Sequence, residues 1–110
     1  NTPVRAAGSR WSLSRAPATS GWTINTNRLR GKLRIEAPDL HPHYASASGS
    51  ETGLYLFQCG TTVAEVNKTI EKKGEGRSLH TSGAANGQTI AGATQTGTHG
   101  SALHFGALHD

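Results

Sequence analysis

Several residue types that stabilise small domains are scarce in this chain of 110 residues. It has one cysteine, Cys59, no methionine, and two residues each of Trp, Tyr and Phe. A single cysteine excludes an internal disulfide, and because Cys59 ends the apolar run 54–59 we expect it to be buried as a small hydrophobe. Hydrophobic residues make up only 34% of the chain. We therefore expect one domain at most, with a thin core and some apolar surface that belongs against a partner.

Long hydrophobic runs are also missing. No segment reaches the ~18–20 apolar residues that a membrane-spanning helix needs, and no signal-peptide core is present. The sequence predicts no membrane segment in this chain and leaves its localisation unknown. Since a strand candidate starts almost at Asn1, we expect the chain to be a fragment or a processed piece of a longer protein.

Acidic residues are absent from the first third. Seven Lys and Arg residues lie between Asn1 and Arg34, whereas all seven Asp and Glu residues lie from Glu36 onward. This basic segment favours an anionic ligand, which could be the phosphates of a cofactor or a nucleic acid. The aromatic residues are scattered and form no stacking platform of the RRM or OB type. We therefore predict no nucleic-acid partner.

Metal-ligand clusters are lacking as well. His41 and His43 flank Pro42 in a histidine pair that could bind a divalent ion. A structural zinc site usually needs four ligands, and no others are evident nearby. We interpret the pair as exposed histidines in a loop and predict no metal site.

What the chain has in abundance is glycine, concentrated with Ala, Thr and Ser in residues 87–101, which carry no Asp, Glu, Lys or Arg. Glycines permit positive φ and close approach of a ligand, and free N–H groups and hydroxyls donate hydrogen bonds to anionic oxygens. A flexible linker is the alternative. The β-branched Ile90 and the absence of Pro, Glu and Lys favour an ordered loop. The spacing matches neither the Rossmann nor the P-loop motif.

The hydrophobic pattern predicts four strands around one helix. Val4–Ala7 and Trp22–Asn25 are short strand candidates, and Lys32–Glu36 alternates charged and apolar residues as a strand with one face in water does. Residues 37–50 are rich in Pro and Ser and predict an exposed loop. The nearly continuous apolar run 54–59 predicts a strand buried on both faces.

The helix is predicted at residues 62–73. Thr62 and Glu65 have the spacing of a capping box, and Val63, Val66 and Ile70 form one apolar stripe. Gly74 suits the position after the helix. We expect this stripe to pack on the strand at 54–57, which gives an α+β fold: a small mixed sheet with one principal helix.

Two motifs resemble one known family. Gly92–Ser101, followed by Phe105–Leu108, is similar to the second flavin-binding loop of FAD-linked oxidases of the vanillyl-alcohol oxidase superfamily, within its aldonolactone and alditol oxidase branch. Val4–Ser12 resembles the first phosphate loop of the same family. Both motifs have the expected order and spacing, and the resemblance runs from about residue 3 to the end.

This resemblance implies that residues 1–110 are the first lobe of a PCMH-type FAD-binding domain plus the second flavin-binding loop. The second lobe and the substrate domain of the same enzyme would be the partners of this chain. The implied reaction transfers hydride from an alcohol, sugar alcohol or aldonolactone, a small-molecule substrate, to FAD. No catalytic residue is expected in this chain. The implied cofactor-binding residues are Ala6, Ala7, Gly8, Ser9, Arg10, Trp11 and Ser12 in the first loop, and Ser82, Thr89, Gly92, Gln95, Thr96, Gly97, Thr98 and His99 around the second.

Trp11 departs from the family pattern. Counted from Gly8, it occupies the position where many members carry a histidine bonded covalently to the flavin. An indole has no acceptor nitrogen to alkylate, so the resemblance implies FAD held non-covalently at the first loop. We also expect the two loops to approach each other and to face the FAD diphosphate. His99 is interpreted either as a structural hydrogen-bonding residue or as a dipole beside the flavin ring.

Two other functional classes use the same features. One is a binding module for a nucleotide or sugar phosphate without redox chemistry, and the other is a basic nucleic-acid-binding fragment. Flavin absorbance separates the oxidoreductase from both, and salt-dependent binding to random DNA identifies the last.

Overall fold

Four short strands pair into two separate two-stranded sheets in the computed structural model, which describes residues 1–44, 53–73 and 76–108. Strands β1 (Val4–Ala7) and β2 (Trp22–Asn25) are parallel, with Val4 opposite Trp22. Strands β3 (Lys32–Arg34) and β4 (Tyr55–Phe57) are antiparallel, with Leu33 opposite Leu56. The helices are η1 (Ala37–Asp39), α2 (Val63–Lys73) and α3 (Ile90–Gln95).

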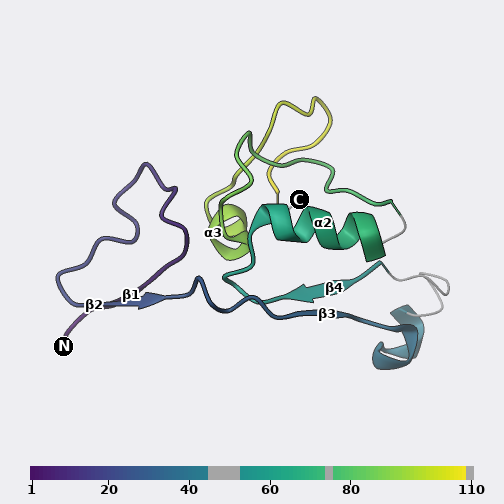
Figure 1. Ribbon diagram of the computed structural model, residues 1–110, viewed down its shortest axis with the longest axis horizontal. Coiled ribbons are helices and arrows are strands. Elements are labelled where there is room, and N and C mark those ends of the chain that lie inside the picture. Colours follow the sequence, from purple (N-terminus) through teal and green to yellow (C-terminus); the bar gives the residue numbers. More distant parts are fainter. Residues whose placement is uncertain (45–52, 74–75, 109–110) are drawn as a thin grey trace.

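The two sheets lie at different ends of the molecule. Helix α2 lies along the β3–β4 sheet, β1 and β2 lie toward the other end, and α3 lies between them (Figure 1). The chain from residue 8 to residue 21 loops away from β1 before it returns as β2, and backbone bonds from Trp22 to Pro3 and from Thr26 to Ala7 extend the parallel pairing. This arrangement places the first loop and α3 next to each other, and the α+β prediction is confirmed.

The start of α2 is fixed by the predicted capping box. The Thr62 N–H donates to Glu65 Oε2 at 2.8 Å, and the Glu65 N–H donates to Thr62 Oγ1 at 3.2 Å. Each residue thus satisfies a backbone donor that the first helical turn would leave unpaired. Val63 and Val66 are buried and Ile70 is partly buried, so the predicted apolar stripe is the inward face of the helix. The predicted C-terminal residue Gly74 lies outside the described residues.

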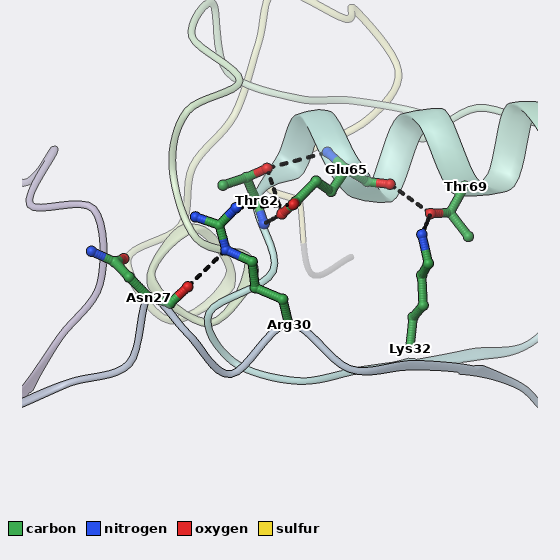
Figure 2. Close-up of polar contacts among 6 residues, drawn as sticks. All are labelled: Asn27, Arg30, Lys32, Thr62, Glu65 and Thr69. Carbon is green, nitrogen blue, oxygen red and sulfur yellow. Dashed lines mark hydrogen bonds and ion pairs between the residues drawn. The ribbon is translucent and has the colours of Figure 1, made fainter.

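Polar side chains connect α2 to β3 and to the segment that precedes it. Lys32 Nζ on β3 donates to Thr69 Oγ1 at 3.2 Å, and Arg30 contacts Glu65 Oε1 at 3.0 Å while its Nε donates to the Asn27 carbonyl (Figure 2). These contacts show that Lys32 faces the helix.

Successive side chains of a strand point to opposite faces of the sheet. Because Lys32 faces α2, the next residue, Leu33, points away from α2. Leu33 and its partner Leu56 are 60% and 53% exposed. The prediction that residues 54–59 form a strand buried on both faces is therefore wrong. Among the described residues β4 has one neighbouring strand and one covering layer, so one of its faces stays open. Cys59 is half-buried rather than buried.

The core is as thin as the composition predicts. Within the described ranges, the buried apolar residues are Ala7, Val63, Val66 and Ala93, and four threonines are also buried. The Cα radius of gyration is 15.9 Å, above the roughly 13 Å of a compact domain of this length. Large apolar side chains such as Trp22 and Leu103 are exposed. No helix within the described ranges is long and apolar enough to span a membrane.

Candidate functional site

A cavity of about 430 Å³ lies where the first loop meets the start and end of α3. Its walls come from two segments that are far apart in the sequence. The first wall comprises Ala6, Ala7, Gly8, Ser9, Arg10, Trp11, Ser12, Leu13, Ala16 and Pro17, and the second comprises Gln88, Thr89, Gly92, Ala93, Thr96 and Thr98. The expectation that the two glycine-containing segments approach each other is confirmed.

Missing side chains at two glycines allow this approach. A Cβ on Gly8 would lie 2.8 Å from Thr89 Cγ2, and a Cβ on Gly87 would lie 2.7 Å from Trp11 Cζ2. Real Cβ atoms do not come this close to other carbons, so a larger residue at either position would force the Thr89 side chain or the Trp11 ring to move. The cavity is therefore built on glycine at the contact between its walls.

The second wall is anchored to the start of α2. The Ile90 N–H donates to the Thr61 carbonyl at 2.7 Å, and the Val63 N–H donates to the Gln88 carbonyl at 2.9 Å. Thr62 and Thr89 form an antiparallel bridge between the same segments. Because the Val63 N–H and the neighbouring Ala64 N–H are paired with protein carbonyls, the first turn of α2 is occupied, and the donors for a ligand come from the loops instead.

Residues 90–95 are helical, which corrects the prediction of one continuous loop over residues 87–101. Glycine and threonine lower helix propensity, but tertiary anchoring overrides such weak preferences. Here the anchors are the bond between Ile90 and Thr61 and the burial of Ala93. The prediction of an ordered rather than a linker-like segment is confirmed.

Gly97 ends α3 and turns the chain back along the cavity. Its φ is +64°, and the Thr98 N–H donates to the Ala93 carbonyl at 2.9 Å. This bond closes a Schellman turn, which needs a left-handed residue and favours glycine. The Leu108 N–H then donates to the Thr98 carbonyl at 2.7 Å, so the returning chain holds Thr98 in place. Of the two roles that glycine permits in this segment, positive φ and close approach of a ligand, Gly97 adopts the first.

Arg10 carries the positive charge of the cavity in an unusual backbone conformation. Its φ is +58°, in the left-handed region that residues other than glycine rarely adopt. Arg10 is exposed and lines the cavity, and none of the described lining residues is acidic. Strained residues of this kind cluster at functional sites.

Hydroxyl and amide groups supply the polar part of the walls. Thr89 is the N-cap of α3, yet its side chain makes no capping bond. The Thr96 hydroxyl donates to the Gly92 carbonyl at 2.8 Å, and Ser12 Oγ is paired with Ser14 Oγ at 2.9 Å. Gln88 Oε1 is buried and accepts no hydrogen bond from a described residue. Backbone N–H groups, a threonine hydroxyl and a guanidinium together suit an anion with several oxygens.

Four predicted site residues do not line this cavity. Ser82 instead lines a shallow depression beside α2 with Asn67 and Glu71. Gln95 is exposed on the last turn of α3, and Gly97 acts through its turn. His99 is exposed, its Nδ1 lies 3.2 Å from the Gly100 carbonyl oxygen, and its backbone bridges to Ala107. These contacts match the structural interpretation of His99.

Five lining residues were not predicted: Leu13, Ala16, Pro17, Gln88 and Ala93. All lie close in sequence to predicted residues, so their proximity to the motifs is the only sequence feature that could have identified them. His41 and His43 are exposed, and within residues 1–44, 53–73 and 76–108 no group of three potential metal ligands occurs.

Comparison with known proteins gives one family and several relatives. The FAD binding domain family matches residues 1–110. The D-arabinono-1,4-lactone oxidase of Yarrowia lipolytica is 29% identical over 105 residues, which cover 96% of this chain and 18% of that protein. The enzymes of the same name from Saccharomyces cerevisiae and Eremothecium gossypii are 31% and 30% identical, over 92% and 96% of this chain. The chain spans less than a fifth of the length of these relatives, at 17% and 18% for the last two. No solved structure matches the chain.

Proposed function

Because this chain belongs to the FAD binding domain family, we propose that it forms one wall of the FAD site of a flavin-dependent oxidoreductase. The substrate class we propose is an alcohol, sugar alcohol or aldonolactone, with the aldonolactone favoured by the names of the yeast relatives. The remainder of the same enzyme would supply the second lobe of the domain and the substrate domain.

One observation carries this proposal: two glycine-containing segments, separated by most of the chain, line a single cavity. Phosphate oxygens need donors that reach them without intervening side chains. The close approach of Gly8 to Thr89 and the guanidinium of Arg10 fit that requirement. The residues present therefore fit the diphosphate of FAD.

Each wall has its own part in binding. The N–H groups of residues 8–12 and the hydroxyl of Thr89 would donate to phosphate oxygens, and Arg10 would offset the negative charge. Thr96 and Thr98 would hold the cofactor from the side of α3. FAD, when bound, supplies the hydride acceptor, while this chain binds and orients it. Ser82, Gln95 and His99 lie outside the cavity, and we propose that they support the loops rather than contact the cofactor.

The proposal includes non-covalent attachment at the first loop. Trp11 lines the cavity at the position where the family pattern has its linking histidine. An indole offers only a donor N–H. Residues that activate the substrate would come from outside this chain.

Two alternative functions remain to be compared with FAD binding. A binding module for a nucleotide or sugar phosphate, without redox chemistry, would use the same cavity, and a basic fragment would bind nucleic acid. No observation favours either over FAD. Yellow colour with flavin absorbance in the purified full-length protein separates the proposal from both alternatives.

The variant that tests this proposal is Gly97→Val in the full-length protein. A β-branched residue at φ +64° is strained, by about 1–3 kcal/mol, and would displace Thr98 from the cavity. We expect FAD affinity to fall at least about tenfold, equivalent to ~1.4 kcal/mol, while far-UV circular dichroism shows that α2 stays folded. Flavin fluorescence titration measures the affinity.

Gly76→Val is the matched control. Gly76 also has a positive φ, +78°, but a Cβ there would meet no atom within 4 Å and the residue lies outside the cavity. This variant should lose similar stability and keep its FAD affinity. Unchanged FAD affinity in folded Gly97→Val protein would contradict the proposal.

A further inference from the structure

Trp11 combines an exposed ring with a fixed position. Its side chain belongs to the cavity wall, yet the residue is 54% exposed. Indoles are among the largest apolar groups in proteins, and an exposed one at a cavity is suited to contact a ligand. The diphosphate contacts proposed above do not require so large a ring at this position.

The ring is held by its edge. A Cβ on Gly87 would lie 2.7 Å from Cζ2, 3.0 Å from Cε2 and 3.2 Å from Nε1 of Trp11, so this edge of the indole rests on the backbone of Gly87. Gly87 directly precedes Gln88, whose carbonyl accepts a hydrogen bond from the Val63 N–H at the start of α2. The indole is therefore braced against the anchored wall of the cavity.

The second tryptophan lacks these features. Trp22 lies on β2, is 71% exposed and does not line the cavity. It pairs with Val4 on β1. Exposure of a tryptophan in this chain therefore does not by itself indicate a binding site. Trp22 provides the control position for variants of Trp11.

We propose that Trp11 is a stacking platform for a planar ring of the cofactor, and that Gly87 sets the position of this platform. This inference rests on the proposed function. Aromatic rings attract one another in offset stacks. Such a contact would hold the cofactor at the position where many family members have a histidine bonded covalently to the flavin. FAD has two planar rings, the isoalloxazine and the adenine, and both have the required chemistry.

The test compares tryptophan variants of the full-length protein by flavin titration. Trp11→Leu should bind FAD about 5- to 100-fold more weakly, the range typical for loss of one stacked ring. Trp11→Phe keeps a smaller ring and should recover most of the affinity. Trp22→Leu should bind FAD as the wild type does. Gly87→Ala should also weaken binding, because its Cβ would displace the indole.

A second measurement separates stacking from a structural role. FMN and ADP, titrated separately, each carry one of the two rings, and the loss in Trp11→Leu should fall on one of them. If the isoalloxazine is stacked, the emission of bound FMN should also rise in Trp11→Leu, since a stacked indole quenches flavin fluorescence.

Wild-type affinity for FAD, FMN and ADP in folded Trp11→Leu would overturn the inference and leave the proposed function standing. An equal loss in Trp11→Leu and Trp22→Leu would also overturn it, because it would indicate general destabilisation. A wild-type protein that binds no FAD would instead contradict the proposed function.

Discussion

At the scale of single residues, two left-handed backbone positions shape the site. Gly97 adopts φ +64° at no steric cost, whereas Arg10 adopts φ +58° with a side chain that disfavours it. A residue in a strained conformation persists when its surroundings require it. At Arg10 the side chain brings positive charge to a cavity wall without acidic neighbours among its described residues.

Arg10→Gly should therefore separate stability from binding. Removing the left-handed strain contributes about 1–2 kcal/mol, and the greater freedom of glycine in the unfolded chain offsets about 0.5–1 kcal/mol of it. We expect the melting temperature to stay unchanged or rise slightly. FAD affinity should fall about 10- to 150-fold, since a charged hydrogen bond contributes roughly 1.5–3 kcal/mol. Calorimetry and flavin titration measure the two quantities.

Arg10→Lys is the control, because it keeps both the charge and the backbone strain. It should retain more FAD affinity than Arg10→Gly and gain no stability. A glycine variant that is less stable but binds FAD normally would show that Arg10 serves the fold rather than the ligand.

At the scale of the elements, α2 is stabilised at its start by Glu65. The pKa of Glu65 is lowered from its ordinary value of 4.5, mainly because its carboxylate accepts the Thr62 N–H. Burial raises this pKa, and the Thr62 hydroxyl and the charge of Arg30 lower it further. Figure 2 shows these groups around the first turn of α2.

A lowered pKa in the folded state predicts a definite pH dependence. The ionised carboxylate stabilises the fold above pH 4.5, the ordinary value, and this stabilisation is lost as the pH falls through the lowered value. Glu65→Gln should therefore be less stable than wild type at neutral pH, by up to about 1 kcal/mol because the site is partly exposed. The difference should vanish in acid. Urea unfolding at several pH values between about 2.5 and 7 measures this difference in the free energy of unfolding.

Glu71→Gln is the matched control on the same helix. Glu71 is exposed and lies near the other end of α2. Its substitution should change stability little. If both variants behave alike, the capping box contributes no specific stability.

The elements also show what sequence patterns can and cannot predict. Strands β1 and β2 and helix α2 follow from local alternation, periodicity and a capping box, and all three lie where these patterns place them. Helix α3 was missed because its stability comes from contacts with Thr61 rather than from its own composition. The burial of β4 was misjudged because it depends on how many layers cover the sheet.

At the scale of the whole molecule, the chain exposes much of its apolar surface. Leu33 and Leu56 form one uncovered pair, and Val4, Trp22 and Ile24 are exposed on one face of the β1–β2 sheet. A parallel sheet is normally covered on both faces. This surface supports the proposal that further parts of the same enzyme pack against the chain.

The candidate site was predictable in part at this scale. The motifs at residues 4–12 and 92–101 identified the two segments that meet, and the cavity lies at their contact. Sequence could not reveal that Ser82 lines a separate depression beside α2, or that Gly87 contacts Trp11, since both depend on how the loops fold back.

Hydrogen–deuterium exchange of the full-length protein, with and without FAD, tests the central claim most directly. The claim is that both segments bind the diphosphate, residues 8–12 through backbone N–H groups and residues 89–98 through threonine hydroxyls. Amides in residues 8–12 and in residues 89–98 should therefore become protected together when FAD is added. Amides of β2, outside the cavity, should exchange as before. Bound FAD that protects only one of the two segments, or neither, would contradict the account.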